Sequence, residues 1–334
     1  MKIDFPHRQF AHCESGVTAN LLKFHGFDCS EALAFGLGAG LFFGYVPFVK
    51  LNFLPLTTFR TAPGAIFKKA TRNLGVVVKK QTFRNPQAAE QVLDRLLAAG
   101  QPVGAQTGVF WLPFFPPAYR FHFNGHNLVV IGREGDDYLI SDPIFEEVVH
   151  CPAADLRKAR FAKGALAPKG KIYYIEKMPQ RYDLQGAIRM SIREVCRNML
   201  RTPVPLAGVR GIRLLSRQLR NWPQRLGEKQ AILHLGHVIR MQEEIGTGGG
   251  GFRFIYAAFL AEAAEILENR QLEKLSEHCT SIGDFWRDFA LLASRVCRGR
   301  AALDTSCGQL ADLLLECAEQ EKSLFVNLQS ALAD

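Results

Sequence analysis

Cys13 is the residue whose type and position most clearly offer chemistry in this chain. It stands where a helix is expected to begin, because apolar residues recur at helical spacing from Val17 to Phe24 and the pattern stops at Gly26. A thiol is a useful nucleophile only when part of it is thiolate, and a helix N-terminus with a neighbouring imidazole promotes that ionisation. Cys13 therefore has the position that a nucleophilic cysteine needs.

The base for such a thiol must come from elsewhere in the chain, and His126 is the best candidate. It precedes the most apolar predicted strand, 127–133, and Asp142 comes just past the next predicted strand. A hairpin turn at 134–137 pairs the two strands and brings Asp142 back beside His126, where a carboxylate can orient the imidazole. Taken singly, an inert buried Cys, a polar His before a strand and an Asp-Pro turn explain these residues equally well. Their order along the chain favours a thiol-dependent site.

The elements that must position these residues form a mixed first half. Helices come first and a mostly antiparallel sheet comes late, which is an α+β plan. The glycine-rich run that follows residue 35 leaves helix for turn or strand. Helices are expected over 13–24, 30–35, 65–74 and 86–99, and strands over 75–80, 102–106, 127–133, 138–141 and 171–175.

The second half reads as helix almost throughout, and we expect an all-α helical bundle. The pattern changes near Met178, so two domains are predicted, at 1–178 and 183–334. The expected helices are 183–201, 211–220, 228–244, 252–269, 271–298 and 306–332.

Composition excludes several protein classes. A hydrophobic content of 48% with 22% charged residues is that of an ordinary globular protein. The longest apolar stretch, 32–49, is interrupted by four glycines and a proline, and the N-terminus has no apolar signal core, so we expect a cytoplasmic protein without stable membrane insertion. The 8 cysteines are scattered with no CxxC pair, which predicts free thiols and no metal site.

The net charge of +9 comes mainly from arginine, much of it within 181–225. A basic surface of this kind favours an acidic partner, although a solvated helix face explains it as well. No nucleic-acid motif accompanies the charge, so nucleic acid is not expected as the partner. Arg193, Arg197 and Arg201 follow each other at a spacing of four, which places them on one helix face.

A glycine-rich loop at 246–251 opens a helix in the second half. Backbone N–H groups of Thr247, Gly248 and Gly249 at a helix N-terminus could hold an anion such as a phosphopantetheine phosphate. Arg253 and Tyr256, on the first turns that follow, are the side chains expected to reach a phosphate or an acyl chain. The loop does not match a nucleotide P-loop, and a flexible hinge between helices is the alternative.

Several of these segments together resemble the N-terminal domain of the butirosin biosynthesis protein H family. The second half, in which the glycine-rich loop leads into Phe252-Arg253, resembles the helical domain that often follows it, so the resemblance covers nearly the whole chain. The matching segments of the first half are His12-Cys13-Glu14-Ser15, Asn20-Leu21-Leu22, His25-Gly26, Ser30-Glu31-Ala32, Phe35-Gly36-Leu37-Gly38, Leu112-Pro113-Phe114-Phe115, Gly125-His126 and Ser141-Asp142-Pro143.

This resemblance implies a C39-like, papain-like cysteine peptidase fold in 1–178, with 183–334 covering or completing the active site. It implies an acyltransferase that takes an acyl group from an acyl-carrier protein thioester and passes it to a small-molecule amine acceptor, with no cofactor, in natural-product biosynthesis. Cys13 is then the nucleophile, His126 the base and acid, and Asp142 the orienting group. Papain-like enzymes place an oxyanion-hole Gln where this chain has His7, and the nearest Gln is Gln9, so either is a candidate donor beside the Cys13 N–H.

Two other functional classes are compatible with the same residues. A cysteine hydrolase, either a thioesterase or a peptidase, would use the same triad with water as the acceptor. A non-catalytic binding module would retain the fold while Cys13 remained buried and unreactive. The acceptor pocket rather than the triad separates transfer from hydrolysis.

Overall fold

The computed structural model describes residues 2–51 and 53–332 and divides the chain into two compact units. Unit 1 combines Met1–Ala34 with Ile66–Tyr182, and unit 2 combines Phe35–Ala65 with Asp183–Asp334. Each unit is therefore built from two separate stretches of sequence. The first half is α+β and the second half is helical, as the periodicity predicts.

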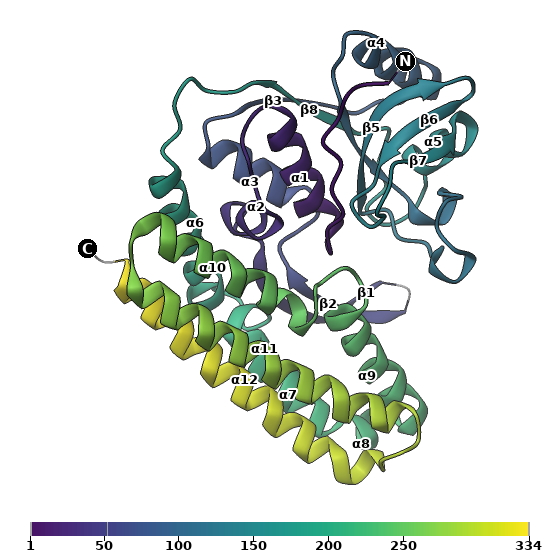
Figure 1. The fold of residues 1–334 in the computed structure, drawn as a ribbon. Coiled ribbons are helices and arrows are strands. Elements are labelled where there is room, and N and C mark those ends of the chain that lie inside the picture. Colours follow the sequence, from purple (N-terminus) through teal and green to yellow (C-terminus); the bar gives the residue numbers. More distant parts are fainter. Residues whose placement is uncertain (1, 52, 333–334) are drawn as a thin grey trace. The chain divides into compact units, whose positions relative to one another are not determined.

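Unit 1 contains an antiparallel sheet of six strands in the order β3-β8-β4-β5-β6-β7 within the described residues (Figure 1). The last strand in sequence, β8, therefore lies between β3 and β4. Thr107 of β4 pairs with His126, the first residue of β5. The strands are β3 (Val77–Gln81), β4 (Val103–Thr107), β5 (His126–Glu134), β6 (Asp137–Ser141), β7 (Val149–Pro152) and β8 (Ile172–Lys177).

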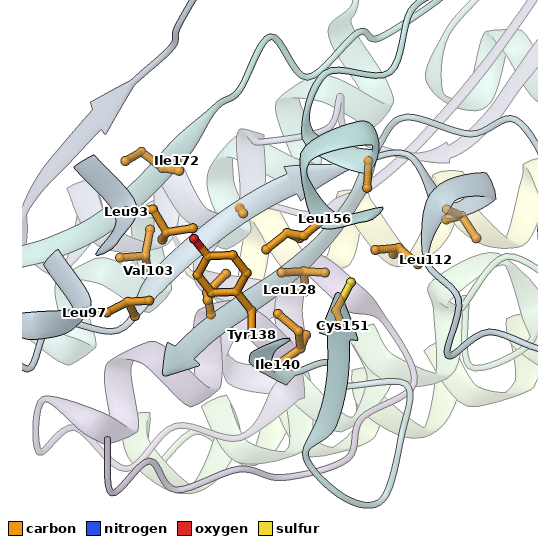
Figure 2. Packing of buried hydrophobic residues seen from close by; sticks show 14 of the residues in the cluster. Leu93, Leu97, Val103, Leu112, Leu128, Tyr138, Ile140, Cys151, Leu156 and Ile172 are labelled. Atoms are coloured by element: carbon orange, nitrogen blue, oxygen red, sulfur yellow. The ribbon is translucent and has the colours of Figure 1, made fainter. Parts of the chain in front are cut away.

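Helices pack on this sheet and enclose its core. Helix α1 packs against β5, and α4 packs against β4 and β5. Figure 2 shows leucines of α4 and α5 against apolar side chains of the central strands, among them Leu128 and Ile140, which are fully buried. The helices that lie wholly or partly in unit 1 are α1 (Cys13–Phe24), α2 (Glu31–Leu37), α3 (Ala65–Asn73), α4 (Pro86–Ala98) and α5 (Ala153–Arg160), with short 3₁₀ turns η1 (Val109–Trp111) and η2 (Pro117–Tyr119).

Unit 2 is a helical bundle with a β-hairpin attached to it. Helix α11 packs along both α10 and α12, and α12 also packs along α7. The hairpin consists of β1 (Leu41–Leu51) and β2 (Leu54–Arg60). The helices are α6 (Leu184–Arg201), α7 (Gly208–Arg220), α8 (Trp222–Leu226), α9 (Glu228–Glu243), α10 (Arg253–Leu267), α11 (Arg270–Cys297) and α12 (Leu303–Ala331), with a 3₁₀ turn η3 (Gly250–Phe252).

Residues 35–65 belong to unit 2, whereas the sequence predicted them to be part of a first domain that ends at residue 178. The hairpin belongs with the helices of unit 2 because its aromatic side chains are buried there. The ring centroids of Phe43 in β1 and Trp286 lie 5.8 Å apart, and Phe35, in α2 before the hairpin, stacks on Phe252 with ring centroids 5.2 Å apart. The backbone joins as well, since the N–H of Tyr45 donates to the carbonyl of Leu206 at 2.8 Å. Periodicity could not reveal these partners, because they lie far along the chain.

The long hairpin and three short elements were not predicted as such from the sequence. The expected turn or strand after residue 35 is the long hairpin β1–β2, and the chain also contains β7, α5 and α8. The last three have four, eight and five residues, too few for a clear apolar period. Among residues 2–51 and 53–332, no helix combines the length and apolarity needed to cross a membrane.

Gly36, near the end of α2, permits close packing of this helix on α10. A Cβ atom at this position would overlap the ring of Phe259, which is fully buried. We expect Gly36→Ala to lower the free energy of unfolding by about 1–3 kcal/mol, the usual cost of overpacking a core. Chemical denaturation of Gly36→Ala, Phe259→Leu and the double variant measures it. Because the smaller Leu makes room for the methyl group, the double variant should lose less unfolding free energy than the two single variants lose together. Strictly additive losses would contradict this packing.

Candidate active site

Cys13 is the first residue of α1, where the preceding turn is held in place by side chains. His12 is the N-cap, with extended backbone, and its ring accepts from the N–H of Ser15. The carboxylate of Glu31 accepts from the N–H groups of Ala11 and His12. The helix thus begins at the cysteine itself, as the apolar spacing predicts, and the dipole of α1 favours negative charge at that point.

Helix α1 approaches the residues after β6 closely because position 16 is glycine. A Cβ atom there would lie 2.6 Å from the Cβ of Pro143 and 3.0 Å from that of Phe10. The N–H of Phe10 donates to the carbonyl of Pro143 at 2.7 Å, which fastens the N-terminal stretch to the same loop. This packing brings Cys13 and Asp142 close together although they lie far apart in the sequence.

His126 and Asp142 form a buried hydrogen-bonded pair. His126 Nε2 donates to Asp142 Oδ2 at 2.6 Å, and the two residues are 4% and 0% exposed. The other carboxylate oxygen accepts from the N–H of Ile144 at 3.1 Å. Phe115 packs edge-on against the His126 ring, with centroids 5.3 Å apart. The imidazole is therefore fixed in orientation, and its Nδ1 atom faces away from Asp142.

The Cys13 side chain also lies beside His126, close enough to raise the pKa of its imidazole. Since Nε2 is held by Asp142, Nδ1 is the ring nitrogen left for the thiol. Burial by itself lowers the pKa of His126, but the charge and hydrogen bond of Asp142, and then Cys13, outweigh it and raise the pKa to about 10. At neutral pH the ring is thus held as imidazolium, the state that stabilises a neighbouring thiolate.

Burial has a different effect on two of the other cysteines. Among the described residues, none of the 8 cysteines forms a disulfide. Burial raises the pKa of Cys151 and of Cys196 to about 12, the charges of Asp155 and Asp137 adding to the effect at Cys151. Thiols of this kind stay protonated and unreactive at neutral pH. The arrangement around Cys13 differs because it supplies both a helix N-terminus and an imidazolium.

The two predicted oxyanion-hole candidates lie against the loop that follows Asp142. His7 uses both ring nitrogens, Nδ1 with Ser141 Oγ at 2.7 Å and Nε2 with the Phe145 carbonyl at 3.1 Å. Gln9 is exposed and its amide donates to the Ile144 carbonyl at 3.1 Å. Both side chains therefore hold the N-terminal stretch to this loop. Donation from His7 to an oxyanion would require it to release one of these bonds.

The glycine-rich loop of unit 2 is occupied by the protein's own acceptors. Thr247 is buried, and its hydroxyl donates to the Gln242 carbonyl at 2.6 Å. The N–H of Gly249 donates to that hydroxyl, and the N–H of Gly250 donates to Glu243 at 3.1 Å. Gly248 has a φ of +67°, which glycine tolerates without strain. Within unit 2 these contacts give the loop the hydrogen bonding of a structural turn, and phosphate binding at this loop stays a prediction.

Arg253 and Tyr256 are likewise part of the core of unit 2. Arg253 is 1% exposed and pairs with Glu321 at 2.7 Å, while Trp286 donates to the same carboxylate at 2.8 Å. Tyr256 is fully buried, and burial raises the pKa of its hydroxyl well above the ordinary value. A guanidinium already neutralised in a core is a poor anion ligand. A ligand contact at Arg253 or Tyr256 stays a prediction, and it would require the side chain to leave the core of unit 2.

Two carboxylates around Cys13, the buried Glu14 and the partly buried Glu31, were not recognised as parts of the site. Glu14 was assigned to the dipole of α1, but its Oε1 accepts from the N–H groups of Ile66 and Phe67 and so caps α3. Glu31 binds the turn before the nucleophile. The only signal in the sequence was the segment Ser30-Glu31-Ala32. Within the part of the chain that the structure describes, no cluster of three or more His, Cys, Asp or Glu side chains could hold a metal ion.

Comparison with known proteins gives two family matches. Residues 12–143 match the model described as butirosin biosynthesis protein H, N-terminal, and residues 154–328 match the model described as domain of unknown function (DUF4872). Among solved structures, a proposed C39-like peptidase from Bacillus anthracis is 18% identical, with a TM-score of 0.38, and covers 54% of this chain and 100% of its own. The search of curated proteins gave no match.

The raised pKa of His126 gives the pair a pH-dependent effect on stability. A histidine whose folded pKa lies above its ordinary value of 6.5 stabilises the fold fully below that value, and this contribution is lost as the pH rises towards about 10. We therefore expect Asp142→Asn to cost about 1.5–3 kcal/mol at pH 6.5, as for a hydrogen bond to a charged group, and clearly less at pH 10. Urea denaturation of both proteins at the two pH values measures it. A cost that is equal at both values would mean that His126 is neutral in the folded protein.

Proposed function

We propose that this chain, which belongs to the family described as domain of unknown function (DUF4872), is a cysteine-dependent acyltransferase. Its match to the butirosin biosynthesis protein H N-terminal domain supports the proposal. The chain takes an acyl group from an acyl-carrier protein thioester and passes it to an amine, which forms an amide. The observation that carries the proposal is the hydrogen-bonded pair of His126 and Asp142 beside Cys13, which is the first residue of α1. Nucleophile, base and orienting group are all present in this arrangement.

The first half-reaction transfers the acyl group to Cys13. The thiolate attacks the carbonyl carbon of the thioester, and the N–H of Cys13 is placed to stabilise the oxyanion that forms. As the intermediate collapses, the bond to the carrier's sulfur breaks and the His126 imidazolium donates its proton to that sulfur. One thioester replaces another, so this step is nearly neutral in free energy.

The second half-reaction releases the acyl group to the acceptor. The neutral His126 formed in the first step takes a proton from the attacking amine, and the nitrogen bonds to the acyl carbon. The Cys13 sulfur then leaves as thiolate beside the regenerated imidazolium. Formation of an amide from a thioester is downhill, which makes the whole transfer favourable without a cofactor.

An acidic carrier protein fits the charge of unit 2. A hollow of about 470 Å³ is lined by Pro205 and Leu315 together with Arg210, Arg213 and Arg217. Arg213 pairs with Glu319 at 2.6 Å, whereas Arg210 and Arg217 are exposed on α7. Apolar side chains surrounded by arginines suit an acidic helix with an apolar residue on its face. This supports docking of the carrier protein within the arginine-rich region.

Cys13→Ala should abolish acyl transfer because it removes the nucleophilic thiol. The fold should be retained because the substitution deletes only that thiol. Intact-mass measurement after mixing with an acyl-loaded carrier protein should give a mass increase equal to the acyl group on the native protein and none on Cys13→Ala. Circular dichroism checks that the variant is folded. An adduct on folded Cys13→Ala would contradict the thiol mechanism, and rapid loss of the adduct to water with no amide formed from added amines would favour hydrolysis.

Reversal of charge at the hollow should weaken docking of the carrier protein. We expect Arg210→Glu with Arg217→Glu to raise the KM for a carrier-bound substrate about tenfold at low salt and to leave a small thioester mimic unaffected. Arg193 is less suitable as a probe, because it donates to the Leu332 carbonyl at 2.7 Å. Arg295→Glu with Arg298→Glu, two exposed arginines outside the hollow, serves as the matched control. If both pairs of substitutions act alike, or if salt has no influence, the hollow is not the docking site.

A further inference from the structure

Glu31 binds the backbone immediately before the nucleophile. Its Oε1 accepts from the N–H of His12 at 2.7 Å and from the Ser15 hydroxyl at 3.1 Å, and its Oε2 accepts from the N–H of Ala11 at 3.1 Å. One carboxylate thus holds two successive peptide N–H groups and a side chain of the first turn of α1. Charged acceptors form the stronger hydrogen bonds of proteins, so this turn is firmly held.

Retaining a carboxylate here has an energetic cost. Burial raises the pKa of Glu31, and the hydrogen bonds from His12, Ala11 and Ser15 oppose this shift. The helix does not need Glu31 as its cap, because the His12 ring already accepts from the N–H of Ser15. The interaction acts on the turn that leads into the helix rather than on the helix itself.

The consequence of this arrangement falls on the N–H of Cys13. That N–H belongs to the peptide between residues 12 and 13. Glu31 orients the peptide on one side of it, between Ala11 and His12, and the first turn of α1 orients the backbone on the other side. We propose that Glu31 is a positioning residue that aims the Cys13 N–H at the oxyanion of the reacting thioester. This inference rests on the proposed acyl transfer.

The imidazole beside the thiol is controlled by groups other than Glu31. The pKa of His126 is set by burial, Asp142 and Cys13, and Glu31 takes no part in it. Glu31 should therefore affect steps that develop an oxyanion and spare those that need only the thiolate. Acylation by a thioester forms an oxyanion, whereas alkylation by iodoacetamide displaces iodide and forms none. The ratio of the two rates isolates the effect of Glu31.

The experiment compares these rates in native protein and in Glu31→Gln. The amide keeps the shape of the side chain, but it places a donor opposite one of the backbone N–H groups. We expect acylation of Cys13 by an acyl-N-acetylcysteamine thioester to slow about 10- to 100-fold. This is less than the roughly 100- to 1,000-fold cost of removing an oxyanion donor, because the N–H remains and is only misaligned. Alkylation by iodoacetamide should change less than about twofold. Ser15→Ala, which keeps both backbone bonds, should leave the ratio near that of the native protein.

Asp94→Asn is the control for loss of a hydrogen-bonded carboxylate elsewhere in unit 1. Asp94, on α4, accepts from the Tyr138 hydroxyl at 2.6 Å and from Arg133 at 2.8 Å. Arg133 lies near the end of β5, whereas His126 is the first residue of that strand. Asp94→Asn should lower stability without altering the ratio of rates. If Glu31→Gln does not fold, Glu31→Asp gives the same comparison, because a side chain shorter by one methylene cannot reach both N–H groups. Acylation should then slow while alkylation is retained.

The possible outcomes are distinguishable. Equal slowing of acylation and alkylation would make Glu31 a structural residue, and unchanged acylation in Glu31→Gln would remove any role for it. Either result would overturn the inference while leaving the acyltransferase proposal intact. If native protein forms no acyl adduct at Cys13 with any thioester, the proposed function itself fails, and this inference fails with it.

Discussion

The close packing of α1 against the loop that follows β6 is the contact on which the candidate site depends. Gly16 allows the helix to approach Pro143, and the residues on either side of that contact are Cys13 and Asp142. A side chain at position 16 would push the helix away from the loop and separate the thiol from the imidazole that Asp142 holds. The reactive arrangement is thus a consequence of backbone proximity first and of hydrogen bonding second.

The two structural units do not coincide with the two family segments. The segment 12–143 contains the hairpin β1–β2, which packs in unit 2, and the segment 154–328 contains β8, which lies between β3 and β4 in the sheet of unit 1. Each segment therefore supplies part of the other's unit. Neither can complete its hydrogen bonding and its core when it is separated from the other, which gives a physical reason for the two segments to occur in one chain.

Both units bury an ion pair, but the pair in unit 2 is part of the core whereas the pair in unit 1 lies beside a nucleophile. Glu321 in unit 2 accepts from Arg253 and from Trp286, so the partners of this pair are all parts of the core. In unit 1, Asp142 holds one side of the His126 ring while the other side faces a thiol at a helix N-terminus. Burial is costly for charge in either case, but only the second pair has a reactive atom as its neighbour.

The sequence by itself determined the features that depend on neighbours in the chain. The start of α1 at Cys13 follows from the apolar period, and the strands on either side of Gly135, with His126 and Asp142 at their outer ends, follow from a short hairpin. Only the tertiary structure decided the features whose partners are distant. Residues 35–65 pack in the helical unit, and Glu31 accepts hydrogen bonds from the backbone before Cys13. Arg253 is buried against Glu321, which lies 68 positions away. Hydrophobic period and turn chemistry act over a few residues, whereas a buried polar group is satisfied by whatever the fold brings beside it.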